Sequence, residues 1–543
     1  MVDAVTNVPT PVNEPVRNYA PGSAERADIE RAIAALRGDA IDLPSVIGGK
    51  DVFAAGERIA VREPHAHARV LGYTSNSGVE QAQAAVAAAK AAAPGWQRLS
   101  YDDRAAIFLR AAELLAGPWR NTLNAATMMG QSKNVIQAEI DAACELIDFW
   151  RFNVHFGRQL LQTQPASGPG VWNRTDHRPL EGFVYAVTPF NFTAIAANLP
   201  TAPALMGNTV VWKPATTGQF AAHLLMRLLQ ESGLPDGVIN MVTGDGKAVS
   251  EVVLADRDLA AIHFTGSTGV FQHFWKEVGS RIDSYRTYPR LVGETGGKDF
   301  VLAHPSADPA VLTTALIRGA FEYQGQKCSA ASRAYVPRSV WQKMDTEFLH
   351  LASQLRFGDV TSDFSLFMGA VIDERSFDRV SGAIDRAHAD DSITVAAGGT
   401  YDKSQGWFIS PTVLLGTDPT AEFFCNEYFG PVLSVHVFED SQFDDVVRVV
   451  DSTSPYALTG SIIANDREAI AHATQALRFS AGNFYINDKP TGAVVGQQPF
   501  GGGRASGTND KAGAMQNLLR WTSTRSIKET LVPPIDHRYP HMG

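Results

Sequence analysis

The sequence contains little cysteine, has no excess of positive charge and lacks long apolar runs. Its three cysteines, Cys144, Cys328 and Cys425, are too few and too scattered for a disulfide framework or a structural zinc site, which indicates a reducing compartment. A formal net charge of −10 leaves no overall basic surface for nucleic acid or anionic membranes. No run reaches the ~18 apolar residues of a membrane span, and the polar N-terminal stretch lacks a signal-peptide pattern. We therefore expect a cytoplasmic protein with small-molecule partners.

Two further motifs are missing. The dinucleotide fingerprint G-x-G-x-x-G is absent, because Gly244-Asp-Gly246 matches it only in part and is more typical of a turn that opens a helix. His65 and His67 stand two residues apart without further ligands, which is more typical of loop histidines than of a metal site. We therefore predict no metal, and any nucleotide site has to be recognised from other features.

The apolar pattern divides the chain into regions. At 543 residues the length predicts about two to four domains. Residues 1–45 indicate an extended arm with one short helix around residues 24–36, whereas residues 79–161 have a helical periodicity that indicates close packing. From Phe183 short apolar runs alternate with helices, as parallel strands and crossover helices do. We expect an α/β fold with a nucleotide-binding sheet, since ligands lie at the carboxyl ends of such strands.

A more extended stretch separates the helical region from the sheet. In residues 162–182 the helical period stops, and prolines and glycines punctuate the chain. A second alternating stretch, residues 523–532, lies near the C-terminus, so the two could pair as strands. Residues 298–500 form another region of alternating strands and helices, which we expect to carry the catalytic residues.

One cysteine stands in a distinctive setting. Asp308 and Pro309 predict a helix start, and apolar residues at helical spacing follow as far as Phe321. We expect this helix to run into Gly325, where the backbone relaxes and presents Cys328 at a surface. A free cysteine alone is more often an inert core residue than a nucleophile, so the surrounding sequence has to carry the assignment.

The surrounding sequence is FEYQGQKCSAASR, residues 321–333. A phenylalanine, three residues and then Gly-Gln-x-Cys, ending in Ser-Arg, resembles the nucleophile motif of NAD(P)-dependent aldehyde dehydrogenases. The resemblance implies a Rossmann-type NAD-binding domain, an α/β catalytic domain and a small β flap used in oligomerisation. We accordingly divide the chain into an N-terminal arm (1–45), a NAD-binding domain (46–161 and 183–297), a flap (162–182 and 515–543) and a catalytic domain (298–514).

The chemistry of that family requires a thiolate, an oxyanion site and a base. Cys328 would attack the aldehyde carbon, while the Asn191 side-chain amide and the backbone N–H of Cys328 would stabilise the alkoxide. Glu294 lies in LVGETGGKD, which resembles the family's E-L-G-G-K with Thr295 in place of leucine. It would be the general base that activates water to release the acid from the thioester. Judged alone, Asn191 is a turn residue and Glu294 a surface carboxylate.

The resemblance also implies which residues hold NAD. FTGSTG, residues 264–269, follows an apolar strand and opens a helix, so its N–H groups could meet a pyrophosphate. Lys213, in Trp-Lys-Pro, matches the lysine that holds the adenine ribose, and Glu427, in NEYFGPV, the glutamate on the nicotinamide ribose. Thr216 replaces a glutamate common in NAD-preferring relatives, yet we favour NAD over NADP. The expected cofactor residues are Thr188, Pro189, Phe190, Lys213, Gly266, Ser267, Gly269, Glu427 and Phe429.

The segment KPTGAVVGQQPFGGGRASGTNDKAG, residues 489–513, narrows the substrate class. It resembles members of the family that oxidise L-glutamate γ-semialdehyde to glutamate in proline degradation. Backbone N–H groups of Gly492 and Ala493, with the Ser329 hydroxyl, would then bind the substrate carboxylate. Phe192 and Phe500 would enclose the aliphatic stem. Each aromatic residue, judged alone, is more often part of a core.

Other functions remain open at this stage. Another semialdehyde dehydrogenase, for example for succinate semialdehyde, would share Cys328, Glu294 and Asn191 and differ around Gly492. A thiol hydrolase would need a histidine to orient the thiol, and no motif marks one. A catalytically silent binding protein on the same fold would have no reason to retain thiol, acid and amide. The resemblance further implies a homo-oligomer, either a dimer or an assembly of dimers.

Overall fold

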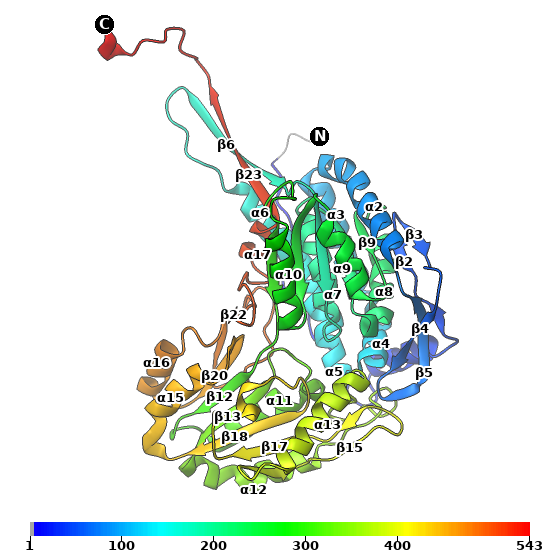
Figure 1. Cartoon of the computed structure of the whole chain (residues 1–543), viewed down its shortest axis with the longest axis vertical. Helices are drawn as coiled ribbons and strands as arrows, with labels where there is room; N and C mark the ends of the chain where they lie inside the picture. The colour runs from blue at the N-terminus through cyan, green and yellow to red at the C-terminus, as the bar shows by residue number, and fades with distance from the viewer. Residues whose placement is uncertain (1–4) are drawn as a thin grey trace.

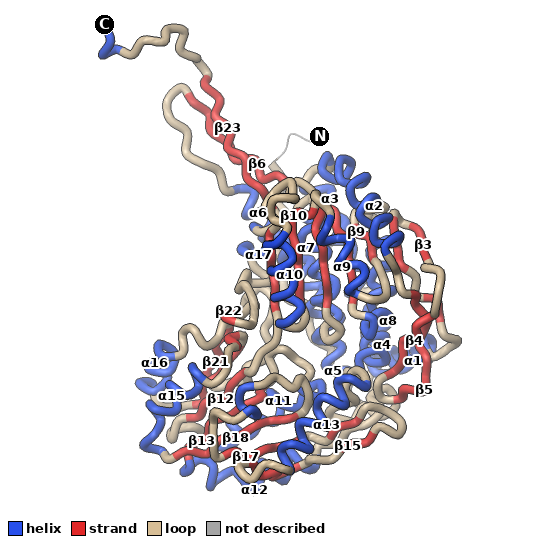
Figure 2. Tube along the Cα trace, in the orientation of Figure 1, coloured by secondary structure: helices blue, strands red, loops and turns tan. Residues whose placement is uncertain are grey.

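The computed structural model describes residues 5–543 and has two lobes, with a two-stranded ribbon that stands out from one end (Figure 1). Each lobe contains a seven-stranded sheet with helices on both faces, as the tube view shows (Figure 2). The α/β fold class expected from the sequence is confirmed. Among the helices of residues 5–543, none combines the length and the apolar character that a membrane crossing requires.

The sheet of the first lobe has the order β11-β10-β7-β8-β9-β2-β3, with β2 antiparallel to both neighbours and the other pairs parallel. Alternate side chains of β7 enter opposite cores, with Val184 and Ala186 on one face and Phe183 and Tyr185 on the other. The strands are β2 (Ser45–Ile47), β3 (Lys50–Val52), β7 (Phe183–Thr188), β8 (Thr209–Pro214), β9 (Ile239–Met241), β10 (Leu259–Thr265) and β11 (Arg290–Glu294).

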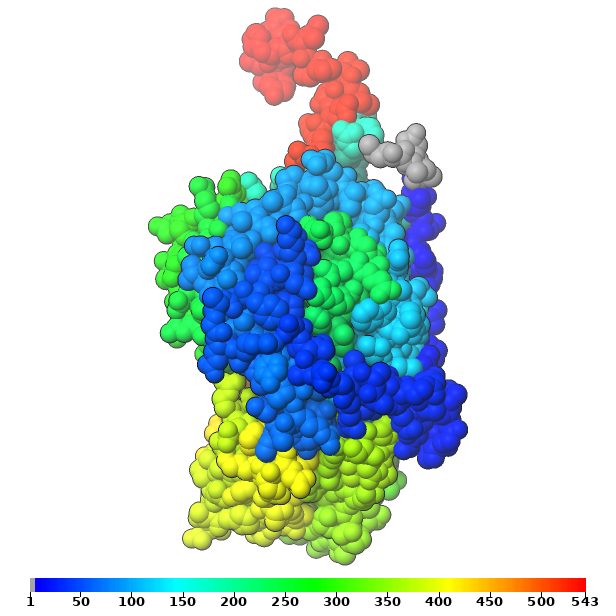
Figure 3. Space-filling model, turned by 90° about the vertical axis from the view of Figure 1, so that its right-hand side faces the viewer, coloured from blue at the N-terminus to red at the C-terminus, as the bar shows by residue number. Residues whose placement is uncertain are grey.

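Helices cover both faces of this sheet. One face packs against α2 (Val79–Arg98), α9 (Gly246–Ala255) and α10 (Thr268–Ser280). The other packs against α3 (Tyr101–Ala116), α6 (Leu146–Gln162), α7 (Thr193–Leu205) and α8 (Gln219–Glu231). Helix α1 (Ala24–Leu36), expected from the sequence, lies against α4 (Arg120–Gln131). The preceding arm runs along the side of the lobe (Figure 3).

The sequence did not predict a β-hairpin that lies in this lobe. It comprises β4 (Arg58–Glu63) and β5 (Ala66–Ser75), with β1 (Ile41–Asp42) on the other side of β5. The register shifts between Val61 and Arg62 and again between Arg62 and Glu63. Such bulges interrupt the alternation of apolar and polar residues, which is the signal by which a strand is recognised.

The sheet of the second lobe has the order β14-β17-β18-β13-β12-β20-β21, and its pairs are parallel except for β14 with β17. The strands are β12 (Asp299–Ala303), β13 (Ala331–Pro337), β14 (Ile393–Ala397), β17 (Thr412–Gly416), β18 (Val432–Phe438), β20 (Thr459–Ile463) and β21 (Asn483–Ile486). The run WFISPTVLL contains both β16 (Phe408–Ile409) and β17, because Pro411 lacks the N–H that a continuous strand needs.

Helices also cover both faces of the second sheet. One face packs against α11 (Pro309–Phe321) and α12 (Arg338–Gln354). The other packs against α13 (Glu374–His388), α14 (Glu422–Cys425), α15 (Phe443–Ser452) and α16 (Arg467–Ala476). Two small ribbons complete this lobe, β15 (Tyr401–Asp402) with β16 and β19 (Tyr456–Ala457) with β22 (Gly503–Arg504).

The protruding ribbon consists of β6 (Val171–Pro179) and β23 (Thr522–Thr530), preceded by the short helix α17 (Met515–Leu519). The strands are antiparallel over their full length, with Thr522 opposite Pro179 and Thr530 opposite Val171. This confirms the pairing expected from the two alternating stretches. The ribbon extends away from both lobes (Figure 1).

The helical region between α4 and the ribbon contains an irregularity. Helix α5 (Val135–Ala138) is followed by a π-helical stretch, η1 (Glu139–Glu145), before α6 begins. The helical periodicity of residues 79–161 did not indicate this irregularity. π-Helical turns are rare and frequently occur at functional sites.

Candidate active site

Cys328 follows a strained turn in the second lobe. Helix α11 ends at Phe321, earlier than the expected end at Gly325. The reason is that Tyr323 (φ 52°) and Gln324 (φ 54°) adopt left-handed backbone conformations ahead of Gly325 (φ 66°). Left-handed conformations cost non-glycine residues of order 1–3 kcal/mol each, so tertiary contacts must stabilise this turn.

The Gln324 side chain supplies those contacts. Its Nε2 donates hydrogen bonds to the carbonyl oxygens of Ser132 (3.0 Å) and Ala370 (2.8 Å), and its Oε1 accepts one from the N–H of Gly369 (2.9 Å). Ser132 ends α4 in the first lobe, whereas Gly369 and Ala370 belong to the second. The turn before Cys328 is therefore held by both lobes.

The sequence predicted Cys328 at a surface, but the structure places this residue below the surface. The residue is 8% exposed. The chain at Gly297 packs closely against it, since a Cβ there would lie 2.3 Å from the Cys328 carbonyl oxygen. Burial raises the pKa of the Cys328 thiol well above its usual value, and the carboxylates of Glu294, Asp299 and Glu427 raise it further. The structure thus favours the protonated thiol.

Asn191 lies between β7 and α7 and points at the nucleophile loop. Its Nδ2 donates a hydrogen bond of 3.0 Å to the backbone carbonyl of Gln326, two residues before Cys328. The residue is 4% exposed. A primary amide has two N–H groups, so one can fix the side chain while the other serves a second acceptor.

A buried ion pair holds the segment that follows Asn191. Asp141, in η1, accepts hydrogen bonds of 2.9 Å from the N–H groups of Thr193 and Ala194, at the start of α7. The same carboxylate pairs with Lys133 at 2.6 Å. The Phe192 ring caps that ammonium, with its centroid 4.1 Å from Lys133 Nζ. Negative charge at a helix N-terminus is stabilising, so this pair fixes the loop that carries Asn191.

Glu294 is the last residue of β11. Its backbone carbonyl accepts a hydrogen bond from the N–H of Gly266 (3.2 Å), and it forms a β-bridge with Gly507. Burial raises the pKa of its carboxyl to about 8, an effect that the ammonium of Lys511 opposes. A carboxyl with such a pKa can gain and lose a proton near neutral pH, as a general base must.

A cavity of about 30 Å³ adjoins Glu294. This is room for two or three water molecules, since one needs roughly 10–15 Å³ by this measure. The cavity wall includes polar and charged side chains, namely Glu145, Asn198, His263, Glu294, Asp510, Lys511 and Asn517, and the aromatic residues Phe149 and Phe500. His263 Nδ1 donates a hydrogen bond of 2.9 Å to the Leu199 carbonyl, and no histidine among residues 5–543 bonds to Cys328.

Glu145 was not predicted from the sequence. It ends η1 and lines the same cavity as Glu294. Burial raises the pKa of Glu145 well above its usual value, and Asp141 raises it further, while Lys133 lowers it. An acidic residue inside a mostly apolar helical stretch was the available signal. Helical periodicity alone indicated only packing.

Several expected cofactor residues lie at the carboxyl ends of β7, β8 and β10. Lys213, in β8, is buried, and its Nζ donates to the adjacent Pro214 carbonyl (2.7 Å). Burial lowers the pKa of Lys213 to about 8. Ser267 begins α10 without a side-chain capping bond, so its hydroxyl and the first N–H groups of the helix have no partner in their own helix. Gly266 and Gly269 flank it, while Thr188 accepts a hydrogen bond of 2.9 Å from Trp212 Nε1.

Glu427 lies against the turn that follows Glu294. Its Oε1 accepts a hydrogen bond of 2.9 Å from the Gly297 N–H, and a Cβ on Gly296 would lie 2.0 Å from its Oε2. Burial raises the pKa of Glu427 to about 7. Phe429 (φ 54°) makes an edge contact with Phe190, next to Pro189, at 5.9 Å between ring centroids. These contacts join the second lobe to the strand ends of the first.

The expected substrate residues are brought together only in part. The Ser329 hydroxyl lies 2.8 Å from that of Thr491, which places the Gly492–Ala493 turn beside the nucleophile. Gly492 has φ 101°, a conformation that favours glycine. Phe500 lines the cavity with Glu294, whereas Phe192 is occupied with Lys133.

The chain has a thiol between two α/β sheets and a carboxylate at a strand end of one of them. This is the arrangement of an aldehyde-oxidising dehydrogenase. Comparison with known families agrees: the model described as "Aldehyde dehydrogenase family" matches residues 52–527, and the chain belongs to this family.

Individual relatives are similar over the whole chain. The mitochondrial delta-1-pyrroline-5-carboxylate dehydrogenase of Dictyostelium discoideum is 47% identical over 542 residues, which is 99% of this chain and 97% of that protein. The crystal structure of the delta-pyrroline-5-carboxylate dehydrogenase from Mycobacterium tuberculosis bound with NAD is 62% identical, covers 100% of both chains and has a TM-score of 0.97. The structure of 1-pyrroline-5-carboxylate dehydrogenase from Thermus with bound NAD is 30% identical. The match covers 97% of this chain and 100% of that chain, with a TM-score of 0.90.

Proposed function

We propose that this protein oxidises L-glutamate γ-semialdehyde, which is in equilibrium with Δ1-pyrroline-5-carboxylate, to L-glutamate, with NAD as the cofactor. The observation that carries the proposal is the position of Glu145 in the cavity beside Glu294, with the Gly492–Ala493 turn next to the nucleophile. Glu145 would supply an acid for an ammonium group, and the Gly492–Ala493 turn would supply backbone N–H groups for a carboxylate. Relatives named for the same substrate support this function.

The reaction begins with Cys328. The thiol gives up its proton to water, and its sulfur forms a bond to the aldehyde carbon while the carbonyl oxygen becomes an alkoxide. The second N–H of the Asn191 amide and the backbone N–H of Cys328 donate hydrogen bonds to that oxygen. Such preorganised donors contribute about 2.7–4 kcal/mol each to the transition state. Loss of hydride from the carbon leaves a thioester on Cys328.

The residues present fit a dinucleotide. Lys213 and Glu427 would hold the two riboses, and the uncapped start of α10 at Ser267 would hold the pyrophosphate. NAD, when bound, supplies the acceptor for the hydride. Thr216 stands at a position where many NAD-preferring relatives have a glutamate. Its hydroxyl donates a hydrogen bond of 3.3 Å to the Gly244 carbonyl. We nonetheless propose NAD over NADP.

Glu294 completes the reaction. In its ionised form it takes a proton from a water molecule, whose oxygen attacks the thioester carbon and releases the acid and the thiol. The adjoining cavity is large enough for that water. Glu145 would pair with the substrate ammonium, while Gly492, Ala493 and Ser329 would bind the carboxylate and Phe500 would contact the stem.

The proposal is tested by NADH formation with glutamate γ-semialdehyde, measured for the natural protein and for Cys328→Ala. We expect turnover by the former and none by the latter, with unchanged far-UV circular dichroism. Succinate semialdehyde, which lacks the amine, serves as the competing substrate. Faster turnover of succinate semialdehyde would favour another member of the family, and absence of NAD binding would favour a thiol hydrolase.

We also propose how the lobes and the ribbon are used. Residues 46–161 and 183–297 would bind NAD, and residues 298–514 would carry the nucleophile. The ribbon, within residues 162–182 and 515–543, would pair copies of the chain into a dimer or an assembly of dimers. Two features support this role of the ribbon, namely the exposed edge of β23 and the half-exposed Trp172 on β6. Sedimentation that shows only monomer at micromolar concentration would contradict it.

A cytoplasmic location is proposed from the sequence. Its support is the presence of free cysteines. The Dictyostelium relative is named as mitochondrial, so the two locations have to be separated by experiment. Fractionation of the source cells with detection of the protein decides between them.

A further inference from the structure

We infer that the N-terminal arm is a positioning element of the substrate site, because Asn13 ties together the two walls of that site. The inference rests on the proposed function, since it concerns how the ammonium and the carboxylate of one substrate are bound at a fixed separation. Asn13 itself touches neither group. Nothing in the sequence pattern of residues 1–45 indicated such a role.

The two walls come from distant parts of the chain. One wall is η1 and the start of α6, which carry Glu145 and Phe149 into the cavity. The other is the loop of residues 491–497, which carries Gly492 and Ala493. The walls are in close contact, since a Cβ on Gly496 would lie 2.2 Å from the ring of Phe152.

Asn13 bonds to both walls at once. Its Nδ2 donates to Asp148 Oδ2 (2.8 Å), one turn beyond Glu145, and to the Val495 carbonyl (2.9 Å) in the loop. Its Oδ1 accepts from Gln497 Nε2 (2.9 Å), also in the loop. A single amide therefore spans the helix that carries the acid and the loop that carries the carboxylate-binding N–H groups.

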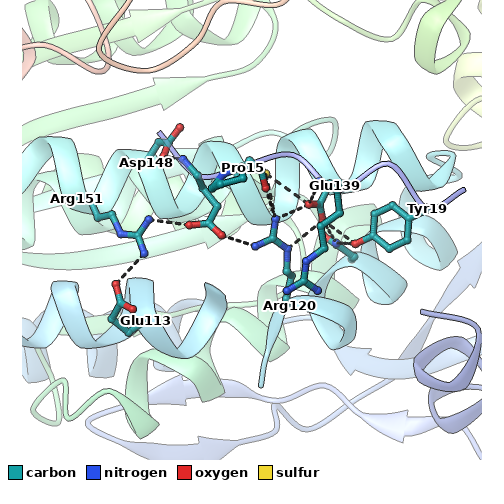
Figure 4. Close-up of polar contacts among 11 residues, drawn as sticks. Pro15, Tyr19, Glu113, Arg120, Glu139, Asp148 and Arg151 are labelled. Carbon is teal, nitrogen blue, oxygen red and sulfur yellow. Dashed lines mark hydrogen bonds and ion pairs between the residues drawn. The ribbon is translucent and has the colours of Figure 1, made fainter. Parts of the chain in front are cut away.

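The arm is itself anchored, so that Asn13 is a fixed support. The Arg120 side chain, 1% exposed, forms ion pairs with Glu14 of the arm and Glu139 of η1 and donates to the Pro15 carbonyl at 2.8 Å. The Tyr19 hydroxyl donates to Glu139 at 2.7 Å. Figure 4 shows this network between the arm and the helices, with Asp148 at one end and Tyr19 at the other.

The arm thus grips the segment that bears Glu145 at both ends. Glu139, at the start of η1, and Asp148, early in α6, both accept hydrogen bonds from arm backbone N–H groups, from Arg17 (2.9 Å) and Glu14 (2.8 Å) respectively. Binding a substrate by two charged ends requires the two receptor groups to stay at one separation. Without the Asn13 bonds, the two receptor groups are no longer held at one separation, whereas the thiol, Asn191 and Glu294 stay in place.

The test compares Asn13→Ala with Asn7→Ala, the same change at an exposed arm position that makes no hydrogen bond to any of residues 5–543. Each variant is assayed with glutamate γ-semialdehyde and with propanal, which lacks both charged groups. We expect Asn13→Ala to raise KM for glutamate γ-semialdehyde about tenfold, the scale of one lost hydrogen bond to a charged group. Its kcat/KM for propanal and its affinity for NAD should match those of Asn7→Ala.

A second variant makes the test independent of any change in folding. Gln497→Ala removes a bond to Asn13 from the opposite wall, and in the double variant with Asn13→Ala it should add no further loss. Equal losses with both aldehydes, or no change with either, would overturn the inference. If the natural protein does not turn over glutamate γ-semialdehyde at all, it is the proposed function that fails.

Discussion

The side-chain amide of Asn191 and the backbone carbonyl of Gln326 are joined by a hydrogen bond of 3.0 Å across the two lobes. This bond uses one of the two N–H groups of the amide and fixes the direction of the other. The nucleophile follows two residues later, so the remaining N–H is held close to where an alkoxide would form. Five predictions follow the parts of the site in turn.

Replacement of Asn191 by alanine removes both amide donors. We expect kcat to fall about 10²- to 10³-fold, since this is the usual effect of losing one oxyanion donor. Steady-state assays with glutamate γ-semialdehyde measure the change, and Asn191→Asp, which lacks an N–H when ionised, should be at least as impaired. A variant that keeps full kcat would remove Asn191 from the oxyanion site.

Activity should depend on the ionisation of Glu294. The pKa of this carboxyl is raised to about 8, so it holds its proton at lower pH and becomes a base as pH rises through that value. When release of the acid limits turnover, we expect kcat to fall about tenfold per pH unit below the pKa and to level off above it. A profile of kcat from pH 6 to 10 provides the measurement.

The variant Glu294→Gln separates the two halves of the reaction. It should give a burst of NADH close to one equivalent per Cys328, followed by turnover slowed about 10²- to 10⁴-fold, because the thioester still forms but no base remains. Rapid mixing with absorbance detection resolves the burst. Rapid steady turnover without a burst would show that Glu294 is not the base.

Glu145→Gln keeps the shape of the side chain and removes its charge. We expect KM for glutamate γ-semialdehyde to rise about 10- to 100-fold, the range for a lost hydrogen bond between charged groups. Oxidation of propanal, which has no ammonium, should not change. Glu251→Gln, the same change at an exposed position of α9, is the matched control. Equal effects on both aldehydes would mean that Glu145 supports the structure and not the substrate.

Gly296→Ala should act on the cofactor through Glu427. The new Cβ would lie 2.0 Å from the carboxylate, which has to move and to leave its bond to the Gly297 N–H. Because the clash is with the end of a flexible side chain, we expect the protein to fold and its affinity for NAD to fall roughly tenfold. Fluorescence titration with NADH measures the affinity. An unchanged affinity would show that Glu427 does not bind the cofactor.

The fold was predictable where local pattern determines it. Strand β7 is buried on both faces, so it forms an uninterrupted apolar run that is easy to recognise. The ribbon strands β6 and β23 alternate, and their pairing could be expected although more than 300 residues separate them. The end of α11 could not, because the conformation of Gln324 depends on Ser132 and Ala370, far away in the sequence.

The candidate site was predictable only where a motif marks it. Cys328, Glu294 and Asn191 stand in short segments that resemble one family. The burial of Cys328 and the position of Glu145 depend on tertiary packing, which periodicity does not contain. The role inferred for Asn13 depends on bonds to Asp148 and Val495, the second of which is 482 positions away.

The hydrogen bonds of Gln324 affect how the two lobes can move. Its amide reaches Ser132 in one lobe and Ala370 in the other, so a hinge that swung the lobes apart would also unwind the turn beneath the thiol. Separating the lobes therefore costs both hydrogen bonds, and we expect the left-handed turn at Tyr323 and Gln324 to keep its shape only while the lobes stay together.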